Sequence, residues 1–181
     1  MFHFRKTLLL GSLSFLLSAC YAMQPDSDKQ PAGAMLSPTK NERVTGWVQF
    51  IPEDIGKTRV KAEIRGLLPG AHGFHIHQYG DCSAPDGSSA GGHFSPGDSD
   101  HGSPASGDHH TGDLGNIMAD VNGVARMDKL FDHLTLKGKR SIVGRGVIVH
   151  QKPDDLNSQP SGDAGPRVAC GVIGMLPISS R

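Results

Sequence analysis

Short apolar runs, several of them alternating with polar residues, favour β-strands along most of the chain. Val60, Ala62 and Ile64 alternate with charged residues, which is the period-two pattern of a strand with one buried face. Further runs cover residues 44–51, 71–78, 114–121, 124–130, 134–136, 141–150 and 168–176. Asn122-Gly123 separates two of them and is typical of a tight hairpin. No segment shows a sustained helical period, so the sequence predicts an all-β Greek-key antiparallel barrel or sandwich of about eight strands.

Two long segments interrupt this pattern, residues 78–112 and 151–166. Both are rich in Gly, Ser, Asp and Pro, and the first has almost no aliphatic residue. Loops of this length inside a compact domain are usually functional or disordered. The first loop holds four histidines and Cys82, so we expect a metal ion and a disulfide to order it.

The N-terminal residues are typical of an export signal. Arg5 and Lys6 precede an apolar stretch over 7–19 that is too short for a comfortable membrane span. It ends in Leu17-Ser18-Ala19-Cys20, which resembles the lipobox of bacterial lipoproteins, with Cys20 acylated after cleavage; an ordinary signal peptide is the alternative. We therefore expect a signal peptide over 1–19, a lipid-anchored flexible tether over 20–41 and a folded domain over 42–181.

Export determines how the cysteines are interpreted. If Cys20 carries lipid, Cys82 and Cys170 remain as one pair. In an oxidising compartment such a pair is most simply a disulfide, and two buried thiols are the alternative.

Histidine is the informative excess in the composition. The chain has 181 residues with 18 basic and 18 acidic side chains, and 10 histidines. A formal charge of zero gives no electrostatic case for nucleic acid binding. The number of imidazoles, in contrast, directs attention to metal chemistry.

The sharpest local feature is Phe74-His75-Ile76-His77. Residues two apart on a strand point to the same side, so His75 and His77 can meet one metal ion while Phe74 and Ile76 enter the core; two exposed strand histidines are the alternative. His72 shares the parity of Phe74 and is predicted to be a packed, hydrogen-bonded structural residue.

The first long loop adds further donors, and a later strand adds one more. His93, His101, His109 and His110 are followed closely by Asp113, a set that suits zinc. His150 ends an apolar run and can bring a further ligand. His133 has no partner in the sequence and is predicted to lie on the surface.

Five motifs in this order resemble the copper,zinc superoxide dismutase family over residues 46–174. They are Gly73-Phe74-His75-Ile76-His77, Gly92-His93-Phe94, Gly112-Asp113-Leu114-Gly115-Asn116, Val149-His150 and the segment 165–174. The lipobox indicates a bacterial, periplasm-facing member, exported and held at a bacterial membrane only through the lipid anchor.

The resemblance implies a role for each matching residue. The copper ligands would be His75, His77, His93 and His150, and the zinc ligands would be His93, His101, His110 and Asp113. His93 would bridge the two metals, and Arg167 would guide the anion; both are the expected catalytic residues. Asp154 would hydrogen-bond one ligand of each metal, and Cys82 and Cys170 would form the disulfide. His109 precedes His110 directly, but the register to Gly112-Asp113 favours His110 as the ligand.

The resemblance also implies the reaction, with one copper and one zinc ion in each subunit. Copper can cycle by one electron and zinc cannot, so superoxide would be dismuted to oxygen and hydrogen peroxide as a protection against extracytoplasmic superoxide. A metal-buffering lipoprotein would lack the bridge or the arginine, whereas His93 and Arg167 are present. A zinc hydrolase would need an open zinc position, and four ligands close it. A monomer and a homodimer both remain open.

Overall fold

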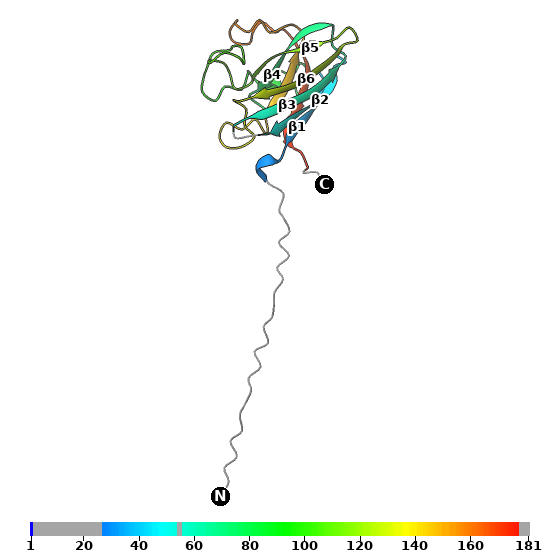
Figure 1. Ribbon diagram of the computed structural model, residues 1–181. Coiled ribbons are helices and arrows are strands. Elements are labelled where there is room, and N and C mark those ends of the chain that lie inside the picture. Colours follow the sequence, from blue (N-terminus) through cyan, green and yellow to red (C-terminus); the bar gives the residue numbers. More distant parts are fainter. Residues whose placement is uncertain (2–26, 54–55, 178–181) are drawn as a thin grey trace.

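The computed structural model describes Met1 and residues 27–53 and 56–177 (Figure 1). The expected signal peptide and Cys20 lie outside the described residues. In the described part of the chain, no helix is long and apolar enough to cross a membrane.

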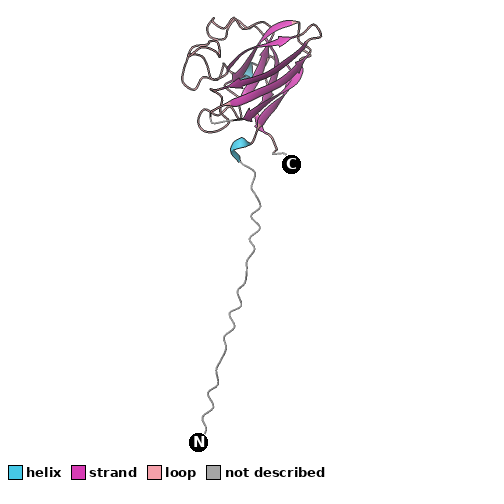
Figure 2. Ribbon diagram, viewed as in Figure 1, coloured by secondary structure: helices cyan, strands magenta, loops and turns pink. Residues whose placement is uncertain are grey.

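The described residues form an antiparallel β-barrel, with no α-helix among them (Figure 2). Its strands are β1 Ala32–Pro38, β2 Thr45–Pro52, β3 Thr58–Arg65, β4 Gly70–His77, β5 Asp113–Ala119, β6 Val124–Phe131, β7 Gly146–His150, β8 Arg167–Val172 and β9 Gly174–Met175, with 3-10 turns η1 Ser27–Lys29 and η2 Ser88–Ala90. They are ordered β2-β3-β6-β5-β4-β7-β8-β1-β9, and a β1–β2 pairing closes the ring. The predicted all-β barrel is confirmed.

Alternation along the strands builds the core. Val60, Ala62 and Ile64 of β3 are buried, as the period-two pattern predicts. On β4, Phe74 and Ile76 belong to the same buried apolar cluster. Burying an aliphatic or aromatic side chain of this size stabilises the fold by roughly 1.5–3 kcal/mol. The apolar face of each strand is therefore directed into the barrel, and the opposite face is left for polar side chains.

The expected tether over 20–41 is wrong for its second half, because residues 32–38 form β1. This strand pairs with β2 from Ala32↔Phe50 to Leu36↔Gly46 and with β8 at Ser37↔Cys170. Ala32, Ala34 and Leu36 are buried. The period-two signal is present but weak, since two of its three apolar members are alanines, which bury little area.

The run over 134–136 is a smaller exception. It contributes only an isolated bridge between Thr135 and Ser141, although Leu134 and Leu136 are buried in the core cluster. Apolar residues in a connection can thus cap the end of the barrel without forming a strand ladder.

The two long loops lie against each other. Gln159 accepts a hydrogen bond from the backbone N–H of His101 at 2.8 Å and donates to the carbonyl of His101 at 2.9 Å. The loops, green and orange in Figure 1, therefore form a single cover next to β4 and β7.

Leu36→Ala should lower the free energy of unfolding by about 2–4 kcal/mol, because it empties part of the core beneath β1. Ser37→Ala, on the exposed face of the same strand, should change it by less than about 0.5 kcal/mol. Urea denaturation of both variants measures the difference. Equal stability of the two variants would restore the tether interpretation of this segment.

Candidate metal centre

Two groups of metal-ligand side chains gather on the outer side of the barrel, beneath the long loops. The first is His75, His77, His93 and His150, and the second is His93, His101, His110 and Asp113. Within each group, one donor atom from every residue lies within 4.8 Å of the others. The structure thus brings together all the residues that the resemblance gives as ligands, and each lies in its expected group.

Two paired strands position most of the first group. β4 presents His75 and His77 on the side opposite Phe74 and Ile76. β7 runs beside β4 in antiparallel register, with His75↔Ile148, so His150 at the end of β7 arrives next to them. The Nε2 atoms of His77 and His150 lie 3.4 Å apart.

The second nitrogen of each strand histidine is held by the protein. His75 Nε2 lies 2.8 Å from Asp154 Oδ2, His77 Nδ1 lies 2.9 Å from the Gly91 carbonyl, and His150 Nδ1 lies 3.0 Å from the Gly165 carbonyl. Such contacts fix the tautomer and the orientation of a ligand ring. The nitrogens left for a metal are therefore Nδ1 of His75 and Nε2 of the other two.

Asp113, the first residue of β5, organises the second group. Its Oδ1 lies 2.7 Å from His93 Nδ1, 3.0 Å from His101 Nδ1 and 3.3 Å from His110 Nδ1. Its Oδ2 accepts hydrogen bonds from the backbone N–H groups of Gly102 and His110 at 3.0 and 2.9 Å. Three imidazoles and one carboxylate form a closed four-donor set, which is typical of structural zinc.

Unpartnered nitrogens test whether metals fit these groups. His75 Nδ1 and His93 Nε2 are buried without a hydrogen-bond partner, and so is His101 Nδ1, whose approach to Asp113 lacks hydrogen-bond alignment. Leaving a buried polar atom unpaired costs about 1–3 kcal/mol. All three atoms belong to residues of the two groups, so metal ions at the group centres would satisfy them, and the donor sets fit copper and zinc. A fourth such atom among the described residues, His133 Nε2, lies outside both groups.

Burial keeps three imidazoles of the first group neutral. It lowers the pKa of His150 to about 3 and that of His93 to about 4, and it holds the pKa of His77 well below its usual range. Hydrogen bonding of His93 to Asp113 opposes the shift without reversing it. At neutral pH these imidazoles therefore keep the lone pairs that a metal requires.

The second group carries the opposite balance. Burial lowers the pKa of His101, but the close carboxylates of Asp113 and Asp154 outweigh it and raise the pKa to about 9. Burial raises the pKa of Asp113, but its close contacts with the rings of His101, His110 and His93 hold that pKa far below its usual range. In the absence of metal, a proton on His101 thus offsets one of the two negative charges of Asp113 and Asp154.

Asp154 joins the two groups. Its Oδ2 contacts His75 and its Oδ1 lies 2.9 Å from His101 Nε2. Asn116 holds its backbone with two hydrogen bonds of 2.8 Å, one to N–H and one to the carbonyl. In the sequence, Asn116 is marked only by its place in the Gly112–Asn116 motif. A Cβ atom at Gly162 would lie 1.9 Å from Asp154 Oδ1, so this position of the loop requires glycine.

His109 and His133 lie beside the zinc group without joining it. His109 Nδ1 contacts the His110 carbonyl at 2.7 Å, and its ring meets that of His133 edge-to-face with centroids 4.4 Å apart. The prediction that His133 lies on the surface is wrong, because its side chain is only 14% exposed. Its partner, His109, lies in a loop 24 positions earlier, so the residues next to His133 in the sequence do not indicate that it is buried.

The prediction that His72 is a packed, hydrogen-bonded structural residue is confirmed. It is 3% exposed, with Nδ1 at 2.9 Å from the His150 carbonyl and Nε2 at 2.8 Å from the Leu68 carbonyl. Both ring nitrogens are thus engaged by the backbone and neither faces a metal group.

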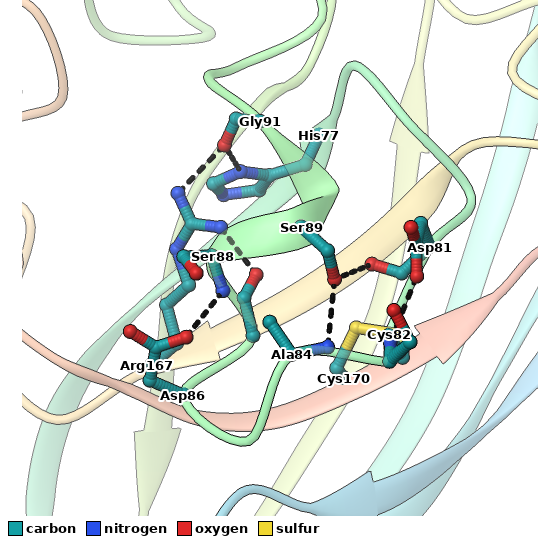
Figure 3. Close-up of a disulfide and its surroundings, with 12 residues drawn as sticks. His77, Asp81, Cys82, Ala84, Asp86, Ser88, Ser89, Gly91, Arg167 and Cys170 are labelled. Carbon is teal, nitrogen blue, oxygen red and sulfur yellow. Dashed lines mark hydrogen bonds between the residues drawn. A yellow bond between two sulfur atoms is a disulfide. The ribbon is translucent and has the colours of Figure 1, made fainter.

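Arg167, the first residue of β8, is fixed by the loop that the disulfide closes (Figure 3). Cys82 and Cys170 form the expected disulfide. The guanidinium donates to the Gly87 carbonyl at 2.5 Å and to the Gly91 carbonyl at 2.6 Å. Because the Gly91 carbonyl also meets His77, Arg167 is held close to the first metal group.

Comparison with known proteins agrees with this geometry. Residues 44–173 match the family described as copper/zinc superoxide dismutase. A "Superoxide dismutase [Cu-Zn] 2" of Mesembryanthemum crystallinum is 45% identical over 141 residues, covering 75% of this chain and 90% of that protein. A "Superoxide dismutase [Cu-Zn] A" of Xenopus laevis is 47% identical over 144 residues, covering 74% and 91%.

A solved structure shares the fold as well. The crystal structure of the clock protein EA4 is 41% identical, has a TM-score of 0.75, and is matched over 84% of this chain and 99% of its own. Together with the two ligand groups and the disulfide, these matches show that the chain belongs to the copper/zinc superoxide dismutase family, as a superoxide dismutase with copper and zinc as its cofactors.

Proposed function

We propose that superoxide is dismuted beside the group of His75, His77, His93 and His150, with copper held there and zinc held by His93, His101, His110 and Asp113. The observation that carries this assignment is the sharing of one ring, His93, by both groups. Its Nδ1 is engaged by Asp113 at 2.7 Å, which leaves the buried Nε2 for the first group. When bound, copper supplies one-electron redox chemistry and zinc a fixed positive charge.

His93 also has a role in proton handling. Two superoxide anions and two protons give one oxygen and one hydrogen peroxide, so the site must supply protons. His93 Nε2 has no protein partner, and Asp113 prevents the ring from turning away. This atom can therefore hold a proton and direct it only toward the first group.

Arg167 is the proposed anion guide. Superoxide offers little besides its charge for recognition, and a fixed guanidinium can orient it and raise its local concentration. Hydrogen bonds to two carbonyl groups fix Arg167, so its position does not depend on the substrate.

Arg167→Ala should reduce kcat/KM for superoxide by at least about tenfold, within the range of electrostatic steering, at unchanged copper and zinc content. Arg167→Glu should reduce it further, because a like charge then faces the anion. Pulse radiolysis with metal analysis measures both quantities. Full activity of the fully metallated Glu variant would remove Arg167 from the mechanism.

His110→Ala should weaken zinc binding by more than the roughly 10–100-fold that loss of a hydrogen-bonding partner of a ligand costs. His109→Ala is the matched control, because His109 is adjacent in sequence but turned toward His133. The zinc affinity of this variant should stay near that of the wild type. Competition with a chromogenic chelator measures both. The opposite order of affinities would exchange the two assignments.

We further propose that the protein is exported, faces the periplasm of a bacterium and is anchored by lipid on Cys20, where it protects against extracytoplasmic superoxide. The supporting features are Arg5 and Lys6, the apolar stretch 7–19 and the lipobox-like Leu17–Cys20 segment. The Cys82–Cys170 disulfide suits an oxidising compartment. The relatives named above come from a plant and a frog, so the bacterial assignment depends on the N-terminal sequence alone.

Cys20→Ala should abolish acylation and move the protein from the membrane fraction to the soluble fraction when the full chain is expressed in a Gram-negative host. Fractionation and mass spectrometry of the N-terminus measure this. A wild-type protein that is unacylated and fully soluble would contradict the anchor, with the dismutase assignment unaffected.

We propose, in addition, that two copies associate through an apolar face formed by Met35, Trp47, Val172 and Met175, which are 74%, 37%, 44% and 42% exposed. Met35 and Trp47 are direct cross-strand neighbours on β1 and β2. The shallow groove at this face is lined by no charged residue. A second copy is the fitting occupant, since a two-fold contact places the same uncharged apolar face on both sides.

Val172→Glu should shift the protein toward monomer, because it places a charge in the proposed contact. Met118→Glu is the matched control: Met118 is 63% exposed on β5, away from this face, and should leave the mass unchanged. Sedimentation over a range of concentrations measures both. A wild-type protein that is monomeric at all concentrations would contradict the dimer.

A further inference from the structure

An acidic side chain stands beside the proposed anion guide. Asp86 lies in the disulfide-closed loop directly before Gly87, whose carbonyl accepts a hydrogen bond from Arg167 Nη1 at 2.5 Å. Figure 3 shows the Asp86 carboxylate next to the Arg167 side chain. Both residues line one surface depression of about 730 Å³, together with Lys40 and Glu42. The charges of Lys40 and Glu42 are opposite and offset each other, so Asp86 and Arg167 make the difference for an anion that enters it.

The backbone holds this carboxylate in place. Asp86 Oδ1 accepts a hydrogen bond from the Ser88 N–H at 2.9 Å, which is an Asx turn. Among the described residues no ion pair joins Asp86 and Arg167, since the guanidinium is directed to the Gly87 and Gly91 carbonyls. The negative charge is therefore close to Arg167 without being neutralised by it.

The two charges nevertheless act on each other. Burial lowers the pKa of Arg167 and the Asp86 carboxylate opposes this. In turn, hydrogen bonds with Ser88, and in smaller part the charge of Arg167, lower the pKa of Asp86. Asp86 is thus ionised at neutral pH and reduces the positive potential that an approaching anion experiences.

We propose that Asp86 is a specificity-determining residue that selects monovalent superoxide over divalent anions at Arg167. Repulsion from a fixed charge is proportional to the charge of the incoming anion. A dianion such as sulfate therefore loses twice the interaction energy that superoxide loses. Its affinity falls by the square of the factor by which the affinity for superoxide falls. This inference rests on the proposed role of Arg167 as the anion guide.

The chain offers a close control for this test. Asp81 belongs to the same loop, is also exposed, and accepts a hydrogen bond from the Ser83 N–H at 2.8 Å in the same kind of turn. Figure 3 shows it on the side of the disulfide away from Arg167. Asp86→Asn and Asp81→Asn change the net charge equally and differ only in position.

The experiment uses fully metallated protein at low ionic strength and measures kcat/KM for superoxide and the inhibition constant of sulfate. Removing a unit charge about 10 Å from the anion, well inside the Debye length at low ionic strength, should raise kcat/KM about twofold in Asp86→Asn, and sulfate inhibition should strengthen about fourfold. Asp81→Asn should change both by clearly less. The effects should shrink at high salt.

Three results would overturn the proposal: no change in Asp86→Asn, equal changes in both variants, or equal factors for superoxide and sulfate. Arg167→Ala separates this failure from failure of the anion guide. If sulfate inhibition persists unchanged in Arg167→Ala, the guide itself is wrong. If it is lost there but Asp86→Asn behaves as wild type, only the selectivity proposal fails.

Discussion

The carboxylate of Asp154 is the contact on which the site depends. It is buried, and its two oxygens hold His75 of one metal group and His101 of the other. A buried charge is tolerated only when it is paired and hydrogen-bonded. Its partners come from β4 and from both long loops, so keeping this one carboxylate satisfied fixes the loops against the barrel and sets the relation between the two groups.

The loops gain their order from polar contacts, since they have few apolar residues to bury. The first loop is bonded to β4 where Phe94 N–H meets the Ile76 carbonyl at 2.9 Å and Ile76 N–H meets the Gly112 carbonyl at 2.8 Å. The Arg145 guanidinium covers the Phe94 ring at 4.1 Å from its centroid. The unpartnered ring nitrogens show that these contacts leave buried polar atoms unsatisfied, and metal ions in the two groups would satisfy them.

What the sequence could predict follows from the range of each interaction. Alternation is local, so it identified β3 and the shared side of His75 and His77. The resemblance supplied the remaining ligands. The pairing of Asn116 with Asp154 joins positions 38 apart, and that of His109 with His133 crosses from a loop to the residues beyond β6. Such contacts depend on how the barrel closes, which no local pattern encodes.

One backbone atom couples substrate recognition to the metal site. The Gly91 carbonyl accepts hydrogen bonds from His77 Nδ1 and from the Arg167 guanidinium. Gly91 has φ of 74°, a left-handed conformation that glycine adopts readily, and a side chain here would lie 2.8 Å from the Tyr79 ring. The spacing between Arg167 and His77 is therefore set at one position, 91, where the backbone conformation and the Tyr79 ring favour glycine.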